Sequence, residues 1–91
     1  KMVKVIKRSG KKEAFSPGKI RKSVGKAAKE AGMAPKRIRI LISDVADPLI
    51  DVVKKKRVVK AVDIRKSMLR RLDRRAKSVS GAWRRYDKRH R

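Results

Sequence analysis

The sequence contains no cysteine, a single histidine, and one residue each of Phe, Trp and Tyr among its 91 positions. Without cysteine, disulfides, thiolate zinc sites and thiol catalysis are excluded. No apolar run approaches the roughly 18 residues of a membrane span, and no signal-peptide pattern follows the basic start. Phe15, Trp83 and Tyr86 are too few to anchor a basic protein on a membrane surface. We therefore expect no membrane partner and a cytoplasmic location.

The groupings of residues on which catalysis depends are also missing. No nucleophile–base pair or glycine-rich phosphate loop is present, and His90, next to the last residue, is expected to be solvated or to face phosphate. Asp44, Asp47 and Asp51 share one helical face, but three monodentate carboxylates on one helix rarely surround a metal ion. Pairing with nearby Lys and Arg is the favoured interpretation. We predict no enzyme, with no catalytic and no metal-binding residues.

Acidic residues are scarce, whereas basic residues are abundant. The 8 acids stand against 31 Lys and Arg, which leaves a formal net charge of +23. A small domain with this charge repels itself unless a polyanion neutralises it. The phosphate backbone of a nucleic acid does so favourably, because each neutralised phosphate releases a counterion. Hydrophobic residues make up 40% of the chain and recur regularly, which predicts a folded domain rather than a disordered tail.

The apolar spacing predicts one small α+β domain over residues 1–91. Ser9 and Gly10 mark a turn between two strands, and Ser16 followed by Pro17 marks the start of a helix that Gly32 closes. Pro48 should kink or interrupt the second helix. Residues 54–60 are expected to form a loop or a short strand. The predicted elements are strands over 2–7 and 11–15 and helices over 17–31, 35–53, 62–72 and 77–88.

The string VIKRSGKKEAFSPGKI, residues 5–20, resembles the opening of the ATP-cone domain. That family typically begins with a valine, a Lys-Arg-Asp-Gly turn, a Glu on the returning strand and a capped helix carrying a Lys; here Ser9 replaces the Asp. The family is the nucleotide-sensing module of ribonucleotide reductases and of a related bacterial repressor. The resemblance implies a small hairpin that caps a bundle of about four helices, in agreement with the predicted order of elements.

The resemblance also implies ATP or dATP as a ligand. Lys7, Arg8 and Lys19 would hold the triphosphate, while carboxylate and hydroxyl groups would contact base or sugar. A region similar to the family's Thr-x-x-x-His segment reads Ala61 and Arg65 here. The implied nucleotide-binding residues are Val5, Lys7, Arg8, Glu13, Ser16, Lys19 and Arg65.

Two functions compete for this fold. A sensor reports to a catalytic or zinc-binding domain, which we do not expect in these residues, and the basic charge extends beyond the needs of one triphosphate. We therefore predict a non-enzymatic protein that binds the nucleic-acid backbone, with an ATP- or dATP-sensing regulatory module as the alternative. The predicted phosphate contacts are Lys54, Lys55, Lys56, Arg57, Arg70, Arg71, Arg74, Arg75, Arg84 and Arg85.

The distribution of charge favours structured RNA over double-stranded DNA. No helix-turn-helix, zinc-finger or aromatic RNA-binding signature is present, so direct base readout is not expected. Basic residues lie on the polar sides of several elements, as suits a protein embedded in a ribonucleoprotein such as the ribosome. A DNA-binding nucleoid protein is the alternative. Residues 44–52, which lack basic side chains, should face away from phosphate, and Trp83 is expected to join the core rather than to stack on bases.

Overall fold

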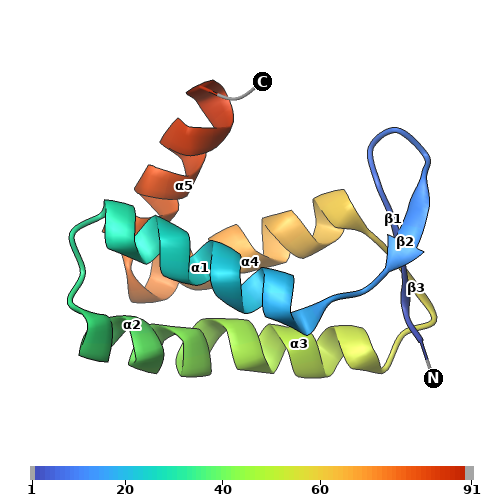
Figure 1. Cartoon of the computed structure of the whole chain (residues 1–91), viewed down its shortest axis with the longest axis horizontal. Coiled ribbons are helices and arrows are strands. Elements are labelled where there is room, and N and C mark those ends of the chain that lie inside the picture. Colours follow the sequence, from blue (N-terminus) through green and yellow to red (C-terminus); the bar gives the residue numbers. More distant parts are fainter. Residues whose placement is uncertain (1, 90–91) are drawn as a thin grey trace.

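A computed structural model describes residues 2–89 of the protein, so the prediction for His90 lies outside the described residues. A small sheet caps one end of a helical bundle (Figure 1), which confirms the predicted α+β architecture. In chain order the elements are β1 (Lys4–Ile6), β2 (Lys12–Ala14), α1 (Pro17–Glu30), α2 (Pro35–Leu41), η1 (Ile42–Ala46), α3 (Asp47–Lys54), β3 (Val58–Lys60), α4 (Ala61–Arg75) and α5 (Lys77–Arg89).

The sheet has one more strand than the predicted hairpin. β1 and β2 pair antiparallel around Gly10, whose φ of 88° lies in the left-handed region that glycine adopts without strain. β3 pairs with β1 in parallel, which gives the strand order β2-β1-β3. The sequence predicted either a loop or a short strand over residues 54–60, and the structure shows a short strand at residues 58–60. The parallel pairing places the start of α4 beside the hairpin.

The first helix begins and ends where its capping residues predict. The Ser16 side chain accepts a hydrogen bond from the Lys19 backbone N–H (3.4 Å), and Pro17 occupies the first turn. Gly32 follows the helix with a φ of 83° and closes it. Only small or branched side chains on its inner face, Val24 among them, are fully buried, so neighbouring helices approach this face closely.

The second helical rod is continuous, although the sequence predicted a kink or a break at Pro48. A π-helical turn, η1, joins α2 to α3, and the Asp47 backbone N–H donates to the Ile42 carbonyl five residues earlier. Pro48 has no N–H to donate, and its ring would collide with the carbonyl four residues earlier in a regular α-helix. The wider π turn accommodates the proline without ending the rod.

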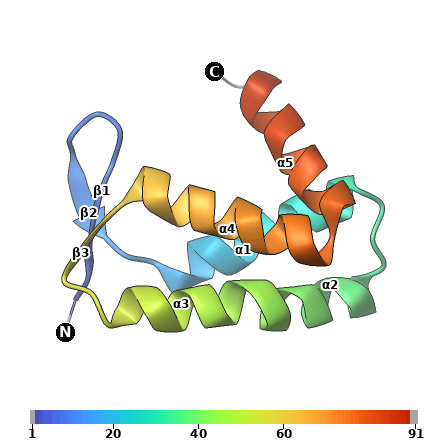
Figure 2. The same ribbon diagram turned by 180° about the vertical axis from the view of Figure 1, so that it is seen from behind.

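The core lies between the α2–η1–α3 rod and helices α1, α4 and α5. Trp83 is half-buried and packs against the core cluster, in line with the expectation that it joins the core, and Tyr86 on the same helix is half-buried as well. Their helix crosses the bundle at an angle, and its carboxyl end leans away from the other helices in both views (Figures 1 and 2).

None of the helices within residues 2–89 has the length and apolarity of a membrane span. The largest fully buried side chains are Ile50, Met68, Leu72, Val24, Val45 and Val79.

Candidate functional site

A pocket of about 300 Å³, here called the sheet-side pocket, lies where the hairpin meets the bundle. Strands β1 and β2 and the loop before α1 form one side of it, and helices α1, α4 and α5 form the other. Segments far apart in the sequence thus build one site. Its lining residues are Val5, Glu13, Ala14, Phe15, Ser16, Lys19, Ile20, Ser23, Ala61, Ile64, Arg65, Met68, Trp83 and Asp87.

Two helices direct their amino ends at this pocket. Ser16 and Lys19 belong to the first turn of α1, and Ala61 is the first residue of α4. Both helices start beside the sheet and run away from it (Figures 1 and 2). The residue before α4, Lys60, makes no side-chain capping bond, so the first N–H groups of α4 keep their capacity to donate. Helix amino ends attract anions, because their N–H groups and dipoles carry partial positive charge.

Of the four ionised side chains that line the pocket, Arg65 and Asp87 pair with each other. Arg65 on α4 donates from Nε to Asp87 Oδ2 on α5 at 2.7 Å, and its Nη2 donates to the same oxygen. Glu13 on β2 has Lys7 Nζ 3.8 Å from its Oε2. Lys19 forms no ion pair within 4.0 Å in the part of the chain that the structure describes. The pocket therefore combines cationic groups and free N–H donors with an apolar wall, an arrangement that suits a ligand with an anionic and an aromatic part.

The ATP cone domain model matches residues 3–91, almost the full length of the sequence. The chain belongs to the ATP-cone family. The predicted membership is thereby confirmed, and the family is a nucleotide-sensing regulatory module rather than a catalytic one. No curated protein matches the sequence.

The sheet-side pocket brings together most of the residues that the ATP-cone resemblance singles out. Val5, Glu13, Ser16, Lys19 and Arg65 all line it. Ala61, which stands in place of the family's threonine, lines it as well. Lys7 and Arg8 do not line the pocket: Lys7 is exposed and contacts Glu13 at 3.8 Å, and Arg8 lies in the exposed hairpin turn. The structure thus assembles five of the seven predicted positions around one cavity.

Sequence reasoning did not identify the contribution of α5 to the sheet-side pocket. Trp83 and Asp87 line it from that helix, four residues apart and hence on one face. The sequence does carry one signal, because Asp87 is the only acid in a helix with five basic residues, Lys77–Arg89. An isolated carboxylate in such a helix indicates a specific partner, and the structure shows this partner to be Arg65.

The predicted phosphate-backbone contacts do not form one surface. Lys54–Arg57 lie at the sheet end of the molecule, whereas Arg70–Arg75 extend along α4 toward the opposite end (Figure 2). Arg84 and Arg85 lie on α5. Two of these arginines are committed to acids: Arg75 lies 3.5 Å from Asp44, and Arg84 binds both carboxylate oxygens of Asp73 at 2.9 Å.

Two of the three aspartates on the predicted acidic face pair with neighbouring helices, as the sequence favoured, whereas Asp51 is exposed and forms no ion pair within 4.0 Å among the described residues. Asp44 pairs with Arg75 of α4, and Asp47 accepts from Arg21 Nε of α1 at 2.9 Å. Within residues 2–89 no group of three or more His, Cys, Asp or Glu side chains is arranged to hold a metal ion. The carboxylates therefore help to fasten the α2–η1–α3 rod to the rest of the bundle.

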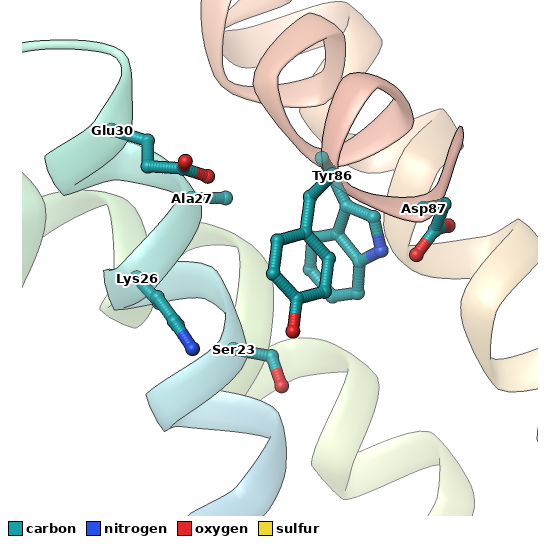
Figure 3. A pocket seen from close by; sticks show the side chains of 7 residues that line it. Ser23, Lys26, Ala27, Glu30, Tyr86 and Asp87 are labelled. Atoms are coloured by element: carbon teal, nitrogen blue, oxygen red, sulfur yellow. The ribbon is translucent and has the colours of Figure 1, made fainter. Parts of the chain in front are cut away.

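A second cavity, here called the helix-side pocket, lies between α1 and the carboxyl half of α5. It measures about 260 Å³ and shares Ser23, Trp83 and Asp87 with the sheet-side pocket. In Figure 3 Tyr86 projects from α5 into this space toward Ser23 of α1. Lys26 Nζ lies 5.3 Å from the centre of the Tyr86 ring, within the range of a cation–π interaction. The carboxyl half of α5 and α1 thus line an open, partly polar space together.

Proposed function

We propose that this chain is a regulatory module that binds ATP or dATP in the sheet-side pocket. The observation that carries the proposal is the convergence of two helix amino ends, Lys19 and Arg65 on one cavity in an ATP-cone chain. The N–H groups at the amino end of α4 and the two cations, Lys19 and Arg65, suit a triphosphate. Charge-assisted hydrogen bonds to phosphate are strong, and Arg offers a bidentate fork. Phe15, Ile20 and Trp83 give the same cavity an apolar surface suited to a nucleobase.

The proposal is tested by thermal unfolding in the presence of nucleotide. A ligand that binds only the folded state stabilises it by about 2.7 kcal/mol at one hundred times its Kd. ATP and dATP should therefore raise the melting temperature in a saturable manner. Adenosine and inorganic tripolyphosphate, tested separately, should each give a smaller rise, since each offers only part of the ligand. Equal stabilisation by tripolyphosphate and ATP would indicate a general anion effect and would contradict a nucleotide site.

Polynucleotide binding is a second candidate function, supported by cations that no acid neutralises. Among the described residues, exposed Arg70, Arg74 and Arg85 have no acid within 4.0 Å, while six of the protein's eight acids are each held by one cation. Because the predicted contacts occupy several faces, structured RNA such as ribosomal RNA is favoured over a DNA duplex, with a nucleoid role as the alternative.

Salt dependence tests this second function. Binding to a random DNA duplex should weaken with a slope of about −0.9 in log affinity against log salt for each phosphate neutralised. Replacing Arg70 and Arg74 together by Ala should reduce the slope by about two such units. Structured RNA, assayed in parallel, should bind more tightly than the duplex at equal salt. Binding that is unchanged in high salt, or by the double substitution, would contradict a phosphate-backbone interface.

A further inference from the structure

We propose that a bound nucleotide takes Arg65 away from Asp87, and that this exchange loosens the last turn of α5, beyond Arg84, from the bundle. The inference rests on the proposed function and deepens it, because it names the element through which occupancy of the pocket is communicated. It has three parts: the geometry of the ion pair, the competition between carboxylate and phosphate, and the way in which α5 is attached.

The Arg65–Asp87 pair lies in the wall of the sheet-side pocket and joins α4 to α5. Both donors used by Arg65, Nε and Nη2, converge on the single oxygen Oδ2 of Asp87. The side chains are 37% and 32% exposed, so a ligand in the pocket reaches the guanidinium without any prior movement of the backbone. Partly exposed ion pairs are weak, since water solvates both charges when they separate. The pair is therefore easily exchanged.

A phosphate is a stronger competitor for Arg65 than a carboxylate in this position. It carries more negative charge, it accepts both arms of the guanidinium fork, and the amino ends of α1 and α4 draw it to the same cavity. Asp87 adds a negative charge to the pocket wall, and its repulsion of a phosphate grows once Arg65 no longer neutralises it, which favours movement of Asp87 away from the pocket. Arg65 gains a better acceptor when it turns to the phosphate, and Asp87 then loses its partner on α4.

The two halves of α5 are attached differently. Val79, Ser80 and Ala82 in the amino half are fully buried. The carboxyl half is joined to α4 and α1 largely by polar contacts: Arg84 with Asp73 at 2.9 Å, Asp87 with Arg65, Arg89 with Glu30 at 3.1 Å, and Tyr86 with Lys26. The helix-side pocket lies between this half and α1 (Figure 3). Beyond Arg84 no side chain up to Arg89 is fully buried, so loss of the Asp87 contact loosens the last turn of the helix.

Loosening of this turn would change the positive surface of the protein. It carries Arg85 and Lys88, two exposed cations on the part of the helix that leans away from the bundle (Figure 1). Nucleotide binding would thus alter how these cations are presented to a partner. Occupancy of the sheet-side pocket would thus be coupled to the position of the basic residues at the end of α5.

The variant Asp87→Asn tests the exchange by titration calorimetry with ATP. It removes both the competing carboxylate and its repulsion of phosphate, so ATP should bind roughly two- to fivefold more tightly, the range that a partly exposed ion pair spans. Asp73→Asn is the matched control, because the Asp73–Arg84 pair also joins α4 to α5 but lies outside the pocket. This control should bind ATP as the wild type does.

Hydrogen exchange of the backbone amides over 83–89 gives an independent measurement. ATP should accelerate exchange in the wild type, whereas Asp87→Asn should exchange quickly with or without ATP. Protection of these amides by ATP, or an Asp87→Asn affinity equal to or weaker than that of the wild type, would overturn the exchange while leaving the nucleotide site intact. A wild-type protein that binds no ATP would instead refute the proposed function, and the exchange with it.

Discussion

Replacing Lys19 by Ala should weaken ATP binding strongly and leave the fold almost unchanged. Lys19 lines the sheet-side pocket from the first turn of α1, its side chain is exposed, and it forms no ion pair with a described acid. A charge-assisted hydrogen bond to phosphate contributes about 1.5–3 kcal/mol, so its loss should lower the affinity roughly tenfold to a hundredfold. The free energy of unfolding without ligand should change by no more than about 0.5 kcal/mol.

Titration calorimetry with ATP measures the effect, and Lys22→Ala provides its control. Lys22 lies on the same helix, is exposed and carries the same charge, but it does not line the pocket. Its removal lowers the overall positive field of the protein by the same amount as the removal of Lys19. Equal affinities in the two variants would show that only net charge matters, and would refute the assignment of Lys19 to the nucleotide site.

Three further predictions concern the scaffold. Leu72→Ala should destabilise the fold by about 2–5 kcal/mol in denaturant unfolding, because Leu72 has 0% exposure and leaves a cavity among the helices. Gly32→Ala should cost about 1–2 kcal/mol although no atom lies within 4 Å of the added Cβ, since the cost comes from a φ of +83°; an unchanged stability would show that the turn adopts another conformation. The hydrogen bonds from Arg84 and then Ser80 hold the pKa of Asp73 well below its usual range. The pair should therefore stabilise the fold above about pH 4 and lose this effect as the pH falls further, and melting curves of Asp73→Asn should lack that part of the acid dependence.

Local signals predicted the hairpin and the helices well. Ser16, Pro17 and Gly32 fix the ends of α1 through capping and backbone conformation, both of which depend on a few consecutive residues. The turn at Gly10 acts in the same way. Such features can be read from sequence because the physical cause lies within the segment itself.

Features that depend on distant segments were predicted only in part, and residues 54–60 were left as either a loop or a short strand. β3 has only three residues and becomes a strand through its pairing with β1, more than fifty residues earlier in the chain. The π turn before Pro48 depends on the packing that keeps the α2–η1–α3 rod continuous. Sequence reasoning recognised that Pro48 perturbs the helix, but the form of the perturbation is decided by tertiary contacts.

The sheet-side pocket, which is the proposed nucleotide site, was predicted in part for the same reason. Residues near the hairpin were named from the ATP-cone resemblance, and five of the seven named positions meet in the sheet-side pocket. Trp83 and Asp87 come from a helix whose position over the pocket follows only from the packed bundle. Net charge, in contrast, is a property of the whole chain and gave no information on where cations gather, so the predicted phosphate contacts are spread over separate elements.

The central claim is that ATP binds at the amino ends of α1 and α4. The most direct measurement is a titration of the isotope-labelled protein with ATP, followed by nuclear magnetic resonance of its backbone amides. We expect saturable shifts concentrated at Lys19, Ala61 and Arg65, with little change at Lys54–Arg57. Shifts that do not saturate, or that spread over the basic residues without reference to the sheet-side pocket, would contradict the account.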